Sequence, residues 1–429
     1  MGIDRSGQSP AVLEKVIYAG TACASFALAS DALWQLAEID VATKQVERRT
    51  QQIGTERCVE RDAETEAYLA LPLVERKGVP SGVTAPDVAV AMMDGGRLQI
   101  LDRAQASDEA VSAQKKGTHW REDKVGLLAS MASKNGEVDP CPTLPQHFVD
   151  AGRIEPLVKE IKANAKSKAV GDGSCDRGMS ASDNGMSAPS SSVVESEYAA
   201  PEVVERSVVA TKQDAHRFGE LLACAAWQRG FYGSSRKAFL GDGSSANWGV
   251  WERHFSSFTP IVDFIHALMY VYQGAMAGRS FAEGWSYYAT WIASLWSGDV
   301  AAVIAGLAAW QAVLGEPEES DGEASPRMKL AESLGYFRNQ QERMKYGEYR
   351  RAGLPITTSH VESTIKRMNQ RVKGTEKFWS EPGSEAILQL RADLLSETQP
   401  LRAFWTRRAE QASGERRQMG RTPQKTLSA

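Results

Sequence analysis

Apolar runs separated by turn-forming residues predict strands in residues 87–133. Residues 87–93 and 97–101 are apolar at most positions, and Asp94-Gly95-Gly96 between them is typical of a hairpin turn. The run at 123–133 predicts a third strand. We therefore expect three consecutive antiparallel strands, with Asp94 at the end of the first.

Helix and strand patterns alternate after residue 210. The expected elements are a helix at 210–231, a strand that ends at Gly241-Asp242-Gly243, a helix, a strand that ends near Asp263, and a helix from His266. Later segments predict tryptophan-rich helices over 281–315, an acidic loop, and helices over 358–373 and 378–397.

A pair of helices is expected in residues 26–54, with Ser30-Asp31 and Thr43 as N-terminal caps and Gly54 as a stop. Val46 would face inward. This pattern fits a helix-turn-helix whose second helix meets DNA, and it fits an ordinary solvated amphipathic helix equally well. The polar face of the second helix would carry Lys44, Gln45, Arg48, Arg49 and Gln51.

The element order fits an α/β, ribonuclease-H-like mixed-sheet core better than a Rossmann sheet, because the leading strands are antiparallel and no phosphate-binding glycine loop is present. A Ser- and Gly-rich tract and a helical segment would interrupt this core. The expected divisions are a helical, helix-turn-helix-like region at 1–80, a core at 84–280 and 354–400, a flexible insertion at 166–200, a helical Trp-rich insertion at 281–353, and a basic tail at 401–429.

Charge is distributed unevenly along the 429 residues, whose formal net charge is -4. Residues 338–425 hold 18 Lys and Arg against 10 Asp and Glu, a local net of +8 that leaves -12 for the remainder. This asymmetry permits a basic surface for a polyanion. The five cysteines form no CxxC pair, so a reducing, cytoplasmic location is the simplest expectation. Residues 291–314 are interrupted by Asp299 and glycines, and buried helices are expected there instead of a membrane span.

Acidic residues at strand ends are the main candidates for chemistry. Asp94 and Asp242 would end neighbouring strands, and Glu362 would lie in the first turn of a late helix. Three carboxylates so close together repel one another unless cations share them. Two Mg²⁺ ions would meet this need and could serve phosphodiester chemistry. Each acid also has a structural alternative: a hairpin corner, a strand-to-helix turn, or a helix N-terminus favoured by the dipole.

Several motifs together resemble DDE-type transposases of bacterial insertion sequences, and most closely those of the Kra-type elements, which share features with the Mutator-like superfamily. The similarity covers roughly Ser30 to Arg402 outside the Ser/Gly-rich tract. The motifs are "VAVAMMDGGRLQIL", "WREDKVG", "AFLGDGSSANWGVWERHF", "PIVDFIHALMYVY" and "SHVESTIKRMNQRVKGTEKFWSEPGSEAILQLRA".

The resemblance implies a catalytic and metal-binding triad of Asp94, Asp242 and Glu362. It also implies that Asp263 and His266, which match an Asp-x-x-His motif, lie near the metals and orient DNA or water. The alternative for His266 is a satisfied histidine at a helix start. The implied activity is Mg²⁺-dependent cleavage at element ends and strand transfer, with two ions for which Mn²⁺ can substitute.

The late helix is also a candidate DNA-binding element, because basic and amide side chains recur on it at helical spacing. The solvated surface helix is the alternative. Double-stranded DNA, as terminal repeats and target, and a homo-oligomer on DNA are the implied partners, with no membrane. Two other functions stay open: a nuclease without strand transfer, and a non-catalytic DNA-binding protein derived from a transposase. The residues in question are Lys366, Arg367, Asn369, Gln370, Arg371 and Lys373.

Overall fold

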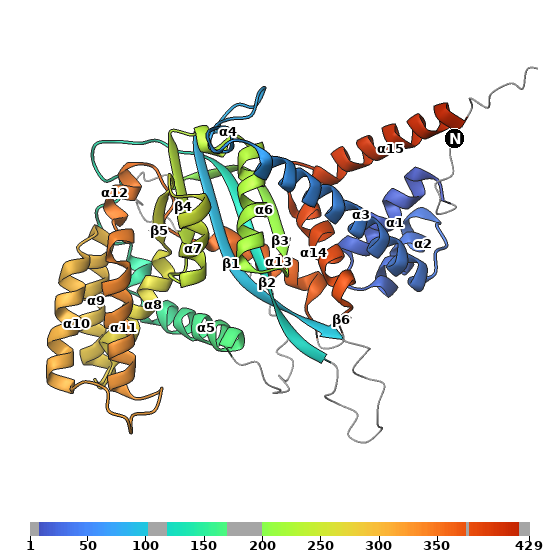
Figure 1. The fold of residues 1–429 in the computed structure, drawn as a ribbon. Coiled ribbons are helices and arrows are strands. Elements are labelled where there is room, and N and C mark those ends of the chain that lie inside the picture. The colour runs from blue at the N-terminus through green and yellow to red at the C-terminus, as the bar shows by residue number, and fades with distance from the viewer. Residues whose placement is uncertain (1–7, 102–117, 170–199, 375–376, 420–429) are drawn as a thin grey trace, which may run out of the picture.

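A mixed sheet flanked by helices forms the centre of the molecule in a computed structural model, which describes residues 8–101, 118–169, 200–374 and 377–419 (Figure 1). The α/β class expected from the sequence is confirmed. The strands are β1 (Val88–Leu101), β2 (Thr118–Ala132), β3 (Glu202–Thr211), β4 (Arg236–Gly241), β5 (Thr259–Val262) and β6 (Phe378–Trp379).

The sheet has the strand order β3-β2-β1-β4-β5. The pairs β1–β2 and β2–β3 are antiparallel, whereas β4 is parallel to both β1 and β5. The short strand β6 pairs with the far end of β1, at Gln99 and Ile100. The central strand is apolar and fully buried from Val88 to Met92, as expected of a strand covered on both faces.

The expected hairpin corner at Asp94 is wrong, because β1 continues through it. Asp94, Gly95 and Gly96 pair in turn with Val125, Lys124 and Asp123 of β2. A Cβ on Gly96 would lie 2.8 Å from a carboxylate oxygen of Asp123. The second glycine therefore makes room for a neighbouring side chain instead of forming a turn.

The third strand of the antiparallel set is also different from the prediction. Residues 123–133, expected as a separate strand, belong almost entirely to β2, and β3 was not predicted. The expected helix at 210–231 is shorter, because β3 occupies its first residues. The Ser/Gly-rich tract lies mostly outside the described residues.

Some helices pack against the sheet, and others lie beyond it on two sides (Figure 1). Their bounds are α1 (Pro10–Ala22), α2 (Phe26–Ala37), α3 (Thr43–Ala70), α4 (Leu73–Arg76), α5 (Ala151–Ala169), α6 (Ala215–Gln228), α7 (Ser245–His254), α8 (Phe264–Met276), α9 (Phe281–Ser297), α10 (Val300–Leu314), α11 (Pro326–Gln340), α12 (Tyr346–Arg351), α13 (Ser359–Val372), α14 (Glu381–Leu395) and α15 (Pro400–Met419).

Helices α1 to α3 form an N-terminal group with an apolar centre that includes Val46, which faces inward as expected. Helix α2 begins after the cap Ser25 and not at Ser30-Asp31. Helix α3 passes through Gly54, the expected stop, because a glycine there allows close contact with Ala386 of α14. Helix α3 is therefore joined firmly to the core.

Helices α8 to α11 pack into a bundle on the opposite side of the sheet from α1 and α2 (Figure 1). The acidic loop between α10 and α11 is confirmed, with Ser325 capping α11. The bundle returns to the sheet through Tyr346, whose hydroxyl donates to the Val262 carbonyl at 3.0 Å. Among the described residues, no helix combines the length and apolar character needed to cross a bilayer.

Candidate active site

Three aspartates from neighbouring strands lie in one row across the sheet. Met92 of β1 pairs with Leu240 of β4, so Asp94 and Asp242, each two residues further on, are level. Gly241 pairs with Val262 of β5, so the following residues Asp242 and Asp263 are level too. Adjacent strands are about 4.8 Å apart, and residues in one row point to the same face. The register therefore brings three aspartates that are 148 and 21 positions apart in the sequence to one level of the sheet.

Asp263 is fully buried and fixes the start of two helices. Its Oδ2 accepts hydrogen bonds from the His266 backbone N–H at 2.9 Å and from His266 Nδ1 at 2.7 Å. Its Oδ1 accepts from the Thr358 N–H at 2.8 Å, immediately before α13. Asp263 thus caps α8, orients His266 and anchors α13, because a short acidic side chain satisfies the unpaired N–H groups of a helix start.

Glu362 reaches this cluster from the first turn of α13. Thr358 Oγ1 donates to its Oε1 at 3.3 Å. Burial raises the pKa of Glu362, and the charges of Asp263 and Asp94 raise it further, while His266 and the Thr358 hydrogen bond lower it. The ligand atoms of Glu362 lie within 4.8 Å of those of Asp263 and His266, so Glu362 joins the cluster at the Asp263 end of the row.

His266 carries the positive charge of the cluster. Burial alone would lower its pKa, but the hydrogen bond and charge of Asp263, with the charges of Asp242 and Glu362, raise it to about 9. The imidazole is therefore protonated at neutral pH in the metal-free protein. A buried cation among carboxylates offsets part of their mutual repulsion.

A metal ion could be held by Asp263, His266 and Glu362, whose ligand atoms all lie within 4.8 Å of one another. The sequence led us to expect Asp94, Asp242 and Glu362 as ligands, and Glu362 is common to both sets. Both oxygens of Asp263 already accept hydrogen bonds, so a cation bound by this residue would have to replace one of them. The donor set, mostly carboxylate oxygen, suits a hard divalent cation.

The loop that carries Asp242 is held from both sides. Asp242 Oδ1 accepts from the Ser244 N–H and from Asn247 Nδ2, each at 2.9 Å. The Tyr336 hydroxyl of α11 donates to the Asp242 carbonyl at 3.0 Å. Gly243 has a φ of +101°, and a Cβ there would lie 2.8 Å from the Tyr336 ring. The helical bundle therefore positions a candidate catalytic acid, and this loop geometry requires glycine.

The predicted DNA-binding residues of α3 differ in their surroundings. Lys44 forms an ion pair with Glu47 at 2.7 Å, and Arg49 donates to Gln52 at 3.0 Å. Arg48 is exposed and forms no ion pair with any residue that the structure describes. The positive charge on the exposed face of α3 is therefore only partly neutralised by neighbouring acids.

The predicted DNA-binding residues of α13 and its C-cap are exposed except for two, the half-buried Asn369 and the buried Arg371. Lys366 pairs with Glu160 at 3.2 Å, and Lys373 lies 5.9 Å from the centre of the Trp120 ring. Arg371 is buried, with 2% of its surface exposed, and does not join the solvated face expected from helical spacing. The exposed members are Lys366, Arg367, Gln370 and Lys373.

Sequence reasoning missed Asp123, a buried acid on the same face of the sheet as Asp94. Asp123 pairs with Gly96, two residues along β1 from Asp94, and 1% of its surface is exposed. Neither carboxylate oxygen has a hydrogen-bond partner on another described residue. Burial raises its pKa to about 7. The only available signal was the Gly-Gly pair, which we had interpreted as a turn.

Comparison of the sequence with protein-family models gave no match, and comparison with curated proteins gave none either.

Proposed function

We propose that this protein is a metal-dependent DNA transposase with a ribonuclease-H-like core, which cleaves DNA at the ends of a mobile element and joins those ends to target DNA. The observation that carries the proposal is the level register of Asp94, Asp242 and Asp263 across the sheet, with Glu362 close to Asp263. The motif resemblance to DDE-type transposases supports the same assignment.

The strand order supports the ribonuclease-H-like assignment. Three antiparallel strands are followed along the chain by two parallel strands, in the order β3-β2-β1-β4-β5, and the strands of Asp94 and Asp242 are neighbours, as we expect of such a core. In this arrangement the end of β4 lies beside the middle of β1, so an acid that follows β4 meets an acid within β1.

Each acidic residue has a distinct proposed role. Asp94, Asp242 and Glu362 would hold divalent cations, with Mg²⁺ as the physiological ion and Mn²⁺ as a substitute. When bound, two such ions would activate an attacking water or 3′-hydroxyl and stabilise the leaving oxygen of the phosphodiester. Asp263 acts as a positioning residue, because its hydrogen bonds fix His266 and the start of α13.

His266 would hold a proton at Nδ1 against Asp263 and orient DNA or water at the cluster. Its closeness to Asp263 and Glu362 supports this role, since the ligand atoms of all three lie within 4.8 Å of one another. Preorganised charges of this kind act without reorganising during the reaction.

DNA would be held by the exposed basic and amide side chains of α13 and α3. Helix α13 supports this role because Lys366, Arg367, Gln370 and Lys373 are exposed on the same helix that presents Glu362. The proposed partners are the terminal repeats of the element and a target duplex, bound by a homo-oligomer that brings two ends together.

The test is a cleavage and joining assay with a duplex that contains one end of the element. The wild-type protein should cut in Mg²⁺, cut in Mn²⁺ and remain inactive in EDTA, and it should join the freed 3′ end to a second duplex. Asp242→Asn should abolish cutting while binding persists.

Each other outcome identifies a different function. Cutting without joining would indicate a nuclease without strand transfer. Binding without any cutting by the wild type would contradict the enzymatic assignment and favour a DNA-binding protein derived from a transposase.

A further inference from the structure

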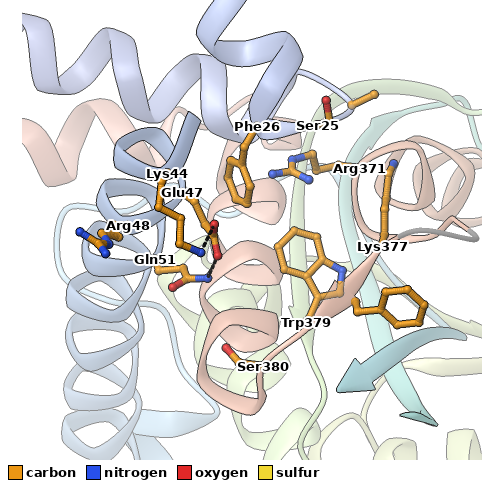
Figure 2. A pocket seen from close by; sticks show the side chains of 12 residues that line it. Ser25, Phe26, Lys44, Glu47, Arg48, Gln51, Arg371, Lys377, Trp379 and Ser380 are labelled. Carbon is orange, nitrogen blue, oxygen red and sulfur yellow. Dashed lines mark hydrogen bonds and ion pairs between the residues drawn. The ribbon is translucent and has the colours of Figure 1, made fainter. Parts of the chain in front are cut away.

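A pocket of about 480 Å³ lies between the N-terminal helices and the end of α13 (Figure 2). Its volume is within the range of pockets that hold small ligands. The charged side chains that line it are Lys44, Arg48, Arg371, Lys377 and a single carboxylate, Glu47. Glu47 accepts hydrogen bonds from Lys44 at 2.7 Å and from Gln51 at 3.4 Å, and both donors belong to α3 itself. The pocket therefore has an excess of positive charge.

Arg371 is the fixed cation of the pocket. Its guanidinium lies 4.3 Å from the centre of the Phe26 ring and 5.0 Å from the Trp379 ring, and its Nε donates to the Gly20 carbonyl at 3.0 Å. Its Nη2 is buried and has no hydrogen-bond partner in the described chain. Figure 2 shows the guanidinium beside the Phe26 ring and above the Trp379 ring. A guanidinium held in this way presents its remaining N–H groups in a defined geometry.

The surroundings of Arg371 contain other cations in place of acids. Burial, together with the charge of Arg391, lowers its pKa to about 10. Burial lowers the pKa of Lys377, and the charges of Arg371 and Arg391 lower it further. Neither arginine forms an ion pair with the residues that the structure describes. Burying unpaired cations is costly, and a bound anion would offset that cost.

We propose that this pocket binds a phosphate group of a DNA strand, with Arg371 at its base and Arg48 and Lys377 at its rim. The excess positive charge of the pocket and the unpartnered N–H group of Arg371 indicate that the ligand is an anion. The guanidinium group of arginine can donate two parallel hydrogen bonds to a phosphate. The choice of DNA as the source of the phosphate rests on the function proposed above.

The pocket and the acidic site lie at different ends and on different faces of α13. Arg371 lies nine residues beyond Glu362, or about 13 Å along the helix axis at 1.5 Å per residue. Nine residues also turn the helix by about 900°, so the two side chains leave α13 on opposite faces. A DNA strand with one phosphodiester at the acids would therefore pass around the end of α13 before another of its phosphates entered the pocket.

The test measures binding of a short duplex to the full chain in EDTA, where no cleavage interferes. Arg48→Gln with Lys377→Gln should weaken binding about tenfold, as loss of one charge-assisted contact predicts. The slope of log affinity against log salt should fall by about 1, the value for one phosphate. The matched control is Arg153→Gln with Arg253→Gln, which removes two exposed charges outside the pocket and should change neither quantity.

A second measurement separates the possible sources of the phosphate. Inorganic phosphate titrated into the wild-type protein and the Arg48/Lys377 variant reports free-anion binding as a rise in melting temperature. If the variant loses this response but binds the duplex like the wild type, the pocket serves a free anion and the DNA assignment is wrong. If the variant binds both probes like the wild type, the pocket proposal fails, whatever the cleavage assay shows.

Discussion

The two ends of helix α13 carry opposite charge in opposite settings. Glu362 in the first turn belongs to a cluster in which Asp263, His266 and Thr358 are joined by hydrogen bonds. Arg371 in the last turn meets two aromatic rings and a backbone carbonyl. Both charges suit the helix dipole.

The difference shows what each end lacks. The acidic end has more carboxylates than His266 alone neutralises, and the pocket at the basic end has four cations against one carboxylate, Glu47. Under the function proposed above, a strand of DNA with its bound divalent ions would supply both missing charges. Helix α13 would then connect the acidic site with the basic pocket.

The substitution Glu362→Gln should have the largest effect, and it tests whether the two ends of α13 have separate roles in cleavage and in binding. Removing the carboxylate should lower the rate of Mg²⁺-dependent cleavage by at least about 100-fold, because a cation ligand is lost. Duplex binding in EDTA should stay within about twofold of the wild type. Glu252→Gln, an exposed residue of α7, is the control. Equal loss of binding and cleavage would contradict the division of roles along α13.

The anchoring role of Asp263 predicts a large loss of folding stability. Asp263→Asn should lower the free energy of unfolding by about 3 kcal/mol, because a buried charge pair is broken and an amide cannot accept all three hydrogen bonds. Asp299→Asn provides the control, since Asp299 caps α10 through one hydrogen bond at 3.1 Å on the surface. That cap should be worth about 1 kcal/mol. Equal effects in urea denaturation would show that the acidic cluster adds nothing to an ordinary cap.

The contact between the bundle and the Asp242 loop predicts a smaller effect for Gly243→Ala. The positive φ and the nearby Tyr336 ring should cost about 2 kcal/mol and displace Asp242, so melting temperature and cleavage should both fall. The matched control is Gly249→Ala in α7, where a Cβ meets nothing within 4 Å. That change should leave stability equal or slightly higher. An undiminished cleavage rate in Gly243→Ala would show that Asp242 does not need this loop geometry.

We expect the smallest effect from Asp123→Asn, whose effect on the melting temperature should depend on pH. The pKa of Asp123 is 3.8 for an unperturbed group and about 7 in the folded protein, so the unfolded chain holds fewer protons in this window and stability falls as pH rises through it. Asp123→Asn should therefore raise the melting temperature by roughly 2 °C or more at pH 8, and have little effect near pH 3.5. Glu122→Gln, its exposed neighbour, should show no such pH dependence. A lower melting temperature for Asp123→Asn at pH 8 would show that the carboxylate has a partner that stabilises it.

The acids that follow strands could be predicted, because the local pattern of apolar residues and turn-forming residues shows where each strand ends. Asp242 and Asp263 each follow an apolar run that forms a buried strand, and the expected order of strands and helices supplied their neighbours. Asp94 does lie level with Asp242, as expected, but the turn that we predict at Asp94 does not exist, because β1 continues through it.

Features that depend on distant segments were not predictable. Arg371 has the helical spacing of a surface residue, but α2 and β6 cover it, and no periodicity within α13 reveals that contact. The turn interpretation of Gly95-Gly96 failed because β2 supplies a partner for every residue of β1 in this stretch, and the side chain of Asp123 fills the space over Gly96.

The most direct test of the central claim is to locate the divalent ion itself. Fe²⁺ in place of Mg²⁺, with ascorbate and peroxide, generates radicals that cut the polypeptide backbone near the bound metal. We expect breaks close to Asp94, Asp242, Asp263 and Glu362 that excess Mg²⁺ suppresses and that Glu362→Gln diminishes. Breaks confined to other parts of the chain, or breaks at these positions that excess Mg²⁺ leaves unchanged, would contradict the central claim.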